Sequence, residues 1–266
     1  MQTLKIFLLV VISALAGCSE YYEYSPNQVR DRNSPEDLNK KNLLKLHANP
    51  KDDTITIAFL GDSQNFYDEA VRFVDKVNNI RAIDLVVIAG DISDYGLLQE
   101  FEWIHERLRK LNKPFIGVIG NHDLVGNGEA VYENMFGPLD FSFIYDSVKF
   151  VIHNTNSREY LKGNVPDMEW LKKELMPANG VQHYIGISHV PPFSGDFNPE
   201  LEDAYSNLLA SAPGFLVSLH GHIHRHTDGY PYDDGVRYVT GPSFEQRSFV
   251  LLKISSGNIS KTIVDY

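Results

Sequence analysis

Three apolar segments in the first half of the chain alternate with two segments of helical periodicity. The apolar runs cover residues 54–60, 84–89 and 114–119, and their length and apolar content are those of buried strands. Between them, residues 66–80 and 97–111 repeat apolar side chains along one helical face, which predicts two helices. The order of these segments predicts a βαβαβ layer with parallel strands.

The second half of the chain continues with shorter alternating segments. Two strands separated by Asp146-Ser147 predict a hairpin, and an amphipathic helix follows at residues 167–175. The remaining predicted strands cover residues 182–188, 214–219, 236–240, 248–254 and 258–264, the last two as antiparallel neighbours. The sequence therefore predicts one α/β domain over residues 54–266, with strand-end loops from both halves at one edge.

Composition narrows the function classes. A hydrophobic content of 43% over 266 residues suffices for one sizeable core. The net charge of −11 excludes a broad basic surface for nucleic acid. It leaves room for a phosphorylated substrate, because bound cations reverse the local field. The single cysteine excludes an intrachain disulfide framework.

The N-terminal segment has the features of a secretory signal. Lys5 precedes an apolar run over residues 6–17, which is too short to span a bilayer core of about 30 Å. Leu15-Ala16-Gly17-Cys18 resembles the bacterial lipobox, which implies cleavage after residue 17 and lipidation of Cys18. A simple secretory signal with an incidental cysteine is the alternative. The resemblance implies a lipid-anchored protein of the bacterial cell envelope, at the outer membrane and facing the periplasm.

Residues 18–53 form a polar segment, which we interpret as a tether between Cys18 and the domain. Within it, Ser34 followed by Pro35 indicates the start of a short helix that runs towards Leu46.

Polar groups follow five of the predicted strands. Their motifs are Gly61-Asp62-Ser63-Gln64, Gly90-Asp91, Gly120-Asn121-His122-Asp123, Ile187-Ser188-His189 and Gly221-His222-Ile223-His224. Open α/β sheets place their sites at the carboxyl ends of strands, and mixed nitrogen and oxygen ligands suit Mn, Fe, Zn or Ni. Each motif alone has a simpler reading, as a turn cap or as a surface histidine patch. All five in order favour a metal centre.

Together these motifs resemble the calcineurin-like metallophosphoesterase superfamily over about residues 54–254. The resemblance implies a four-layer α/β/β/α sandwich. It also implies a dinuclear site whose metal-bridging hydroxide hydrolyses a phosphomonoester, a phosphodiester or a pyrophosphate. The implied ligands are Asp62, Gln64 and His224 for one ion, Asn121, His189 and His222 for the other, and Asp91 as the bridge. His122 would stabilise the transition state or protonate the leaving oxygen, oriented by Asp123.

One position departs from the family pattern, because Gln64 stands where the first motif usually has histidine. Its neutral amide oxygen suits Mn better than Fe or Zn, so we expect looser binding of that ion. His220 and His226 have no role in the motifs, and we expect His226 to be a solvated loop residue.

The substrate class is a phosphorylated small molecule or lipid, and specificity is expected in the loops at residues 124–136 and 157–165. The alternative function is a membrane-anchored binding or structural module that keeps the fold with little turnover.

Overall fold

The computed structural model describes residues 25–48 and 53–266. Within these ranges no helix combines the length and the apolar content needed to cross a bilayer. Cys18 and the predicted signal segment 1–17 lie outside the described residues, so the signal peptide and lipid anchoring stay predictions.

The first sheet contains the predicted βαβαβ layer. Its five strands lie in the order β11-β10-β1-β2-β3. They are β1 (Ile55–Leu60), β2 (Leu85–Ile88), β3 (Phe115–Gly117), β10 (Ser248–Ser255) and β11 (Asn258–Asp265). Strands β1, β2 and β3 are parallel, whereas β10 runs antiparallel to both β1 and β11. The connecting helices are α3 (Tyr67–Asn78) and α4 (Leu98–Leu108).

The second sheet has six strands in the order β4-β5-β6-β7-β9-β8. They are β4 (Phe141–Tyr145), β5 (Val148–Ile152), β6 (His183–Ile187), β7 (Phe215–His220), β8 (Thr227–Gly229) and β9 (Arg237–Thr240). The four central strands are parallel, and the edge strands β4 and β8 are antiparallel to their neighbours. Helices α6 (Met168–Glu174) and α7 (Glu202–Ser211) belong to this half.

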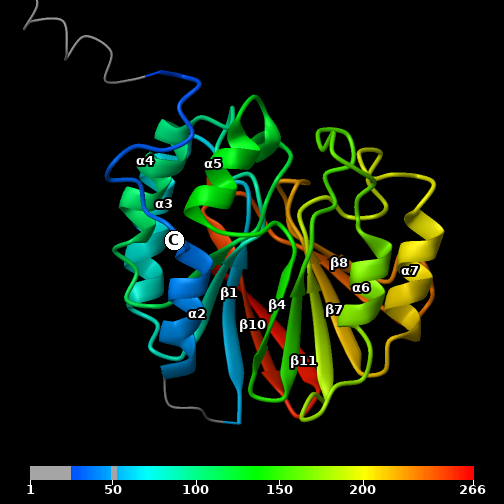
Figure 1. Cartoon of the computed structure of the whole chain (residues 1–266). Coiled ribbons are helices and arrows are strands. Elements are labelled where there is room, and N and C mark those ends of the chain that lie inside the picture. Colours follow the sequence, from blue (N-terminus) through cyan, green and yellow to red (C-terminus); the bar gives the residue numbers. More distant parts are fainter. Residues whose placement is uncertain (1–24, 49–52) are drawn as a thin grey trace, which may run out of the picture.

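Three apolar cores separate four layers, which confirms the α/β/β/α sandwich (Figure 1). Side chains of a strand alternate between its two faces. In β1, Ala58 and Leu60 pack with α3 and α4, while Ile57 and Phe59 pack against the second sheet. A third core lies between the second sheet and helices α6 and α7. This burial on both faces explains why the central strands are continuous apolar runs.

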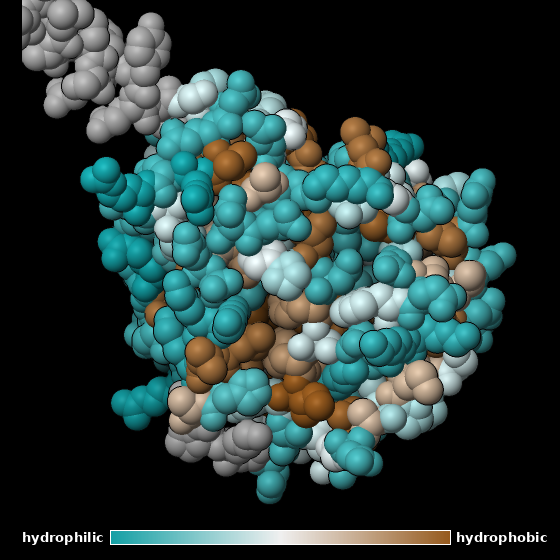
Figure 2. Space-filling view, in the orientation of Figure 1, coloured by the Kyte–Doolittle hydropathy of each residue, from teal (hydrophilic) through white to brown (hydrophobic). Residues whose placement is uncertain are grey.

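Helix α2 (Leu38–Ala48) belongs to the folded body, although the sequence assigned its residues to the tether. Asn39 exchanges two side-chain hydrogen bonds with Gly117 of β3. The predicted start at Ser34 is wrong, because the Ser34 hydroxyl bonds Asp31 and Glu102 and the helix begins at Leu38. Between α2 and β4 the surface is recessed and apolar, with a cavity of about 380 Å³ (Figure 2).

Two helices lie where the sequence predicted none. Helix α5 (Gly128–Met135) occupies most of the predicted loop 124–136, and α7 lies in a segment without a prediction. Two short 3-10 turns, His122–Leu124 and Phe244–Gln246, follow strand ends close to the site. Strand β3 ends at Gly117, two residues before the predicted end.

Candidate active site

The loops after β1 and β2 are joined by main-chain hydrogen bonds. Asp62 N–H donates to Gly90 O at 2.9 Å, and Gln64 N–H donates to Asp91 O at 3.0 Å. Five of the seven predicted metal ligands have positive φ angles, namely Asp62, Gln64, Asp91, His222 and His224. Non-glycine residues adopt this region infrequently, and such strain gathers at functional sites.

Glycines allow the loops of both sheets to approach one another. A Cβ at Gly120 would lie 2.0 Å from Asp91 N, and a Cβ at Gly221 would lie 2.3 Å from Ala89 O. Gly221 follows β7 in the second sheet, whereas Ala89 follows β2 in the first. The absence of a side chain is therefore required for the two sheets to share one site.

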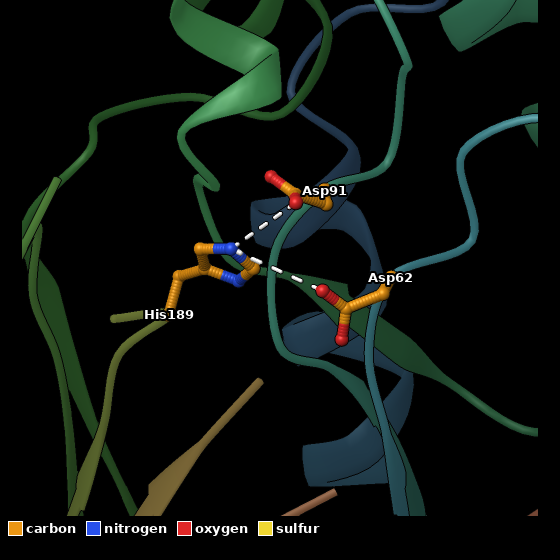
Figure 3. A group of neighbouring side chains, drawn as sticks. All are labelled: Asp62, Asp91 and His189. Atoms are coloured by element: carbon orange, nitrogen blue, oxygen red, sulfur yellow. Dashed lines mark ion pairs between the residues drawn. The ribbon is translucent and has the colours of Figure 1, made fainter. Parts of the chain in front are cut away.

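The centre of the site is formed by Asp62, Asp91 and His189 (Figure 3), and Asn121 lies beside His189. His189 Nε2 lies 3.2 Å from Asp91 Oδ2, 4.0 Å from Asp62 Oδ1 and 3.0 Å from Asn121 Oδ1. The other ring nitrogen, Nδ1, donates to Ala89 O at 2.7 Å. One imidazole nitrogen thus faces three side-chain oxygens contributed by three different strand ends.

His222 and His224 approach the same centre from the loop after β7. His222 Nδ1 lies 3.1 Å from Asn121 Oδ1, and His224 Nε2 lies 3.3 Å from Asp62 Oδ1. Burial lowers the pKa of both histidines, which favours the neutral imidazole that binds metals.

The buried groups fit a cation. Asp62 Oδ2 is buried without a hydrogen-bond partner, and ligand atoms of Asp62, Asp91 and His189 lie within 4.8 Å of one another. Burial raises the pKa of Asp62 to about 8; His189 opposes this shift and Asp91 adds to it. Burial opposes the charge on His189 too, but the Asp91 carboxylate raises its pKa to about 10. A metal ion would replace that proton and stabilise the ionised carboxylates.

The predicted role of Asp123 in orienting His122 is wrong. The buried Asp123 carboxylate accepts hydrogen bonds from the main chain of Ile92, Ser93 and Gly120 and from the Ser93 hydroxyl. His122 Nδ1 instead lies 2.8 Å from the main-chain oxygen of Asp94. A carbonyl oxygen only accepts, so Nδ1 carries the hydrogen and Nε2 is left for the substrate.

Gln64, His226 and Asp196 differ in how well the sequence predicted their places. Gln64 is buried next to the centre, and its role as a ligand stays a prediction. His226 lies in the loop before β8, as predicted, but is half-buried, with its ring between Thr240 O and Lys261 Nζ. Asp196 was missed, although its Oδ2 accepts from His222 Nε2 at 2.9 Å. No motif includes Asp196, so only its proximity in the fold identifies it.

Two curated proteins share partial similarity with this chain. "Probable cyclic nucleotide phosphodiesterase" of Xenorhabdus bovienii is 26% identical over 98 residues, covering 37% of this chain and 34% of that protein. "Probable glycerophosphodiester phosphodiesterase GpdQ" of Arcobacter nitrofigilis is 25% identical over 170 residues, covering 56% of this chain and 60% of that protein. The chain thus matches about a third and three fifths of these relatives.

Solved structures share the fold at low sequence identity. GAP50, the anchor in the inner membrane complex of Plasmodium, has a TM-score of 0.63 at 16% identity and covers 80% of this chain and 85% of its own. A dimetal phosphatase from Danio rerio has a TM-score of 0.58 at 13% identity, covering 81% and 100%. The family model of calcineurin-like phosphoesterases matches residues 55–226. The chain therefore belongs to the calcineurin-like phosphoesterase family.

Proposed function

We propose that this protein hydrolyses phosphodiesters at a dinuclear metal site. The observation that carries the proposal is the convergence of His189 Nε2 on oxygens of Asp62, Asp91 and Asn121. The names of both curated relatives support a diester as substrate. A phosphomonoester is the alternative within the same chemistry.

The proposed dinuclear site uses all seven predicted ligands, and the Asp62, Asp91 and His189 cluster supports it. Asp62, Gln64 and His224 would hold one ion, Asn121, His189 and His222 the other, and Asp91 would lie between them. Ions held there would supply Lewis acidity towards the phosphoryl oxygen and towards water. With an amide at Gln64 and a carboxylate at Asp62, the first position suits Mn.

The chain itself supplies orientation and proton transfer. Asp91 Oδ1 accepts from the His122 main-chain N–H at 3.0 Å, which fixes the start of the 3-10 turn. Asp94 O holds the His122 ring by Nδ1. His122 Nε2 is then the group that exchanges a proton with the leaving oxygen, once the imidazole is charged.

Hydrolysis of bis(p-nitrophenyl) phosphate and p-nitrophenyl phosphate tests this function. We expect chelated protein to be inactive, added Mn to restore turnover, and the diester to be the better substrate. Asp91→Asn is the control, because it keeps the side-chain volume and removes the carboxylate. Turnover of the wild type equal to that of Asp91→Asn with every metal tested would contradict catalysis.

A binding or structural module is the second candidate, since GAP50 has this fold and is described as an anchor. The fold alone therefore does not establish turnover. The retained Asp91, Asn121, His122 and His189 favour the enzyme, because a purely structural role does not require a buried cluster with an unpartnered carboxylate oxygen.

A further inference from the structure

A phosphate ester must approach this site through a field of carboxylates. Asp62, Asp91, Asp94 and Asp196 all contact one of the candidate site residues. Among the Lys and Arg side chains in ion pairs within the described residues, only Arg158 pairs with a carboxylate that bonds a predicted metal ligand.

Arg158, Asp196 and His222 form a continuous chain of contacts. A guanidinium nitrogen of Arg158 pairs with Asp196 Oδ1, and Asp196 Oδ2 accepts from His222 Nε2 at 2.9 Å. The Arg158 side chain is 65% exposed and that of Asp196 is 34% exposed. The guanidinium can therefore meet a solute without leaving its place beside the centre.

The fold fixes the two loops that carry this pair. Asn198 N–H donates to Ser157 Oγ at 3.0 Å, which joins the residue before Arg158 to the residue two positions after Asp196. Ser157 Oγ also donates to Val165 O at 3.0 Å. Asn156 Nδ2 donates to Ile119 O at 3.1 Å, in the segment that leads to Asn121. The pair is thus attached on the same side as the metal ligands.

We propose that Asp196 is a positioning residue for His222 and that Arg158 binds the phosphate group of the substrate. The second half of this proposal rests on the proposed function; the first half does not. Since the Asp196 carboxylate accepts the Nε2 hydrogen, Nδ1, which faces the centre, is the nitrogen that His222 would offer to a metal ion. His189 has its own acceptor in Ala89 O, which no side-chain substitution removes.

The guanidinium suits a phosphate because its planar set of donors matches two oxygens at once. Asp196 holds Arg158 at the edge of the site until an anion arrives, and charge-assisted hydrogen bonds to the anion then replace or supplement that ion pair. Arg158 lies in the segment 157–165, where the sequence predicted specificity.

Titration of metal-free protein with Mn tests Asp196 without any turnover. Asp196→Ala should weaken binding of one ion by about 10- to 100-fold, the usual effect of removing such a hydrogen-bond partner. Asp196→Asn keeps an acceptor oxygen and should lose less. In metal-free protein, ¹H–¹⁵N correlation of the imidazoles should show a hydrogen on His222 Nε2 in the wild type and a smaller population of it in Asp196→Ala. The exposed Asp203→Ala of α7 is the matched control.

Binding of inorganic phosphate to the Mn-loaded protein tests Arg158. Arg158→Ala should raise the Kd of phosphate and the KM of the diester by about tenfold or more, with Mn affinity within about twofold of wild type. Arg158→Lys keeps the charge and should recover part of the loss. Lys162→Ala is the control, since Lys162 is an equally exposed cation of the same segment, paired with Glu129.

Two results would overturn the proposal. Unchanged Mn affinity and unchanged protonation of His222 Nε2 in both Asp196 variants would remove the positioning role. Equal phosphate affinity in wild type and Arg158→Ala would remove the anion-binding role. If no ester is hydrolysed, the proposed function fails, whereas the metal and phosphate titrations still decide the roles of this pair.

Discussion

His122 and Asp123 are adjacent in the chain but make different contacts. The Asp123 carboxylate joins the loop after β2 to the loop after β3, through four hydrogen bonds. Burial raises the pKa of Asp123 to about 7, with the Asp91 carboxylate adding to the shift and the main-chain donors opposing it. His122 instead projects from the turn towards solvent, held by Asp94 O.

This difference predicts separable effects of two substitutions. His122→Ala should lower turnover by about 10²–10⁴-fold, the usual effect of losing a general acid, and leave metal content and stability unchanged. Asp123→Asn should lower the free energy of unfolding by about 1–3 kcal/mol, because the new amide hydrogens face buried donors. Elemental analysis, kinetics and urea unfolding measure both. Loss of an ion in His122→Ala would make His122 a ligand instead.

For single residues, the sequence predicts which side chains belong to the site better than it predicts which side chains contact each other. Asp62, Asp91, Asn121, His189, His222 and His224 could be chosen because each directly follows a recognisable strand or its turn. Their mutual contacts agree with that choice. Asp196 and Arg158 lie in irregular loops, so nothing in the local pattern marks them. Asp123 was misassigned because adjacency in the chain does not make two side chains face each other.

Helix α7 is linked to the second sheet by buried polar groups. Tyr205 of α7 has its hydroxyl 2.8 Å from His153 Nε2 and 3.5 Å from Ser218 Oγ. Ser218 Oγ lies 2.8 Å from His220 Nε2, and Ser188 Oγ lies 3.0 Å from His220 Nδ1. His220, which the motifs left without a role, thus connects the two strands that carry His189 and His222.

His153 makes the stability of this connection depend on pH. Burial lowers its pKa to about 4, from an ordinary value of 6.5. Between pH 6.5 and 4 the folded protein therefore holds fewer protons on His153 than the unfolded chain. The contribution of neutral His153 to the free energy of unfolding is fully present above pH 6.5 and is lost as the pH falls towards 4.

His153→Gln keeps an acceptor for the Tyr205 hydroxyl, which donates to His153 Nε2 in the wild type, and removes this titration. The wild type should lose about 2–3 kcal/mol relative to His153→Gln between pH 7 and pH 4.5, measured by urea unfolding at both values. Asp140, whose pKa burial raises to about 6, is present in both proteins and cancels. If the difference in free energy of unfolding between the two proteins stays constant with pH, the proton taken up on unfolding does not bind to His153.

Strands and their connecting helices were easier to predict than peripheral helices. The buried strands bury both faces and so read as continuous apolar runs. Helix α7 buries only a narrow stripe that includes Tyr205 and Leu209, which leaves a weak periodic signal. Helix α2 starts late because Ser34 finds partners in Asp31 and Glu102 rather than in the first turn of the helix.

For the whole molecule, the site exists only when both sheets have come together. The predicted ligands in the loops after β1, β2 and β3 lie in one half of the chain, and His189, His222 and His224 come from the other. The order of the strands could be predicted within the βαβαβ layer, whereas the pairing of β10 with β1 joins distant residues. That pairing is set by tertiary packing, which local periodicity does not report.

Asn39 has a consequence for how molecules of this protein meet one another. Strand β3 is at the edge of its sheet, and exposed edge strands are templates for intermolecular pairing. The Asn39 amide donates to Gly117 O at 3.0 Å and accepts from Gly117 N–H at 2.9 Å. The Tyr132 hydroxyl also donates to Gly117 O, but of these two side chains only the Asn39 amide pairs with both backbone groups of Gly117, as the backbone of a second molecule would.

Asn39→Ala should therefore promote self-association as well as destabilise the fold by about 1–3 kcal/mol. Asn42→Ala is the matched control, because Asn42 is equally buried on α2 but bonds only Leu38 O of its own helix. Light scattering of each variant is measured at the same temperature interval below its own midpoint of unfolding. This separates self-association from loss of stability. Equal scattering from both variants would mean that destabilisation alone drives association; stronger scattering from Asn39→Ala would make this amide a guard against β-sheet aggregation.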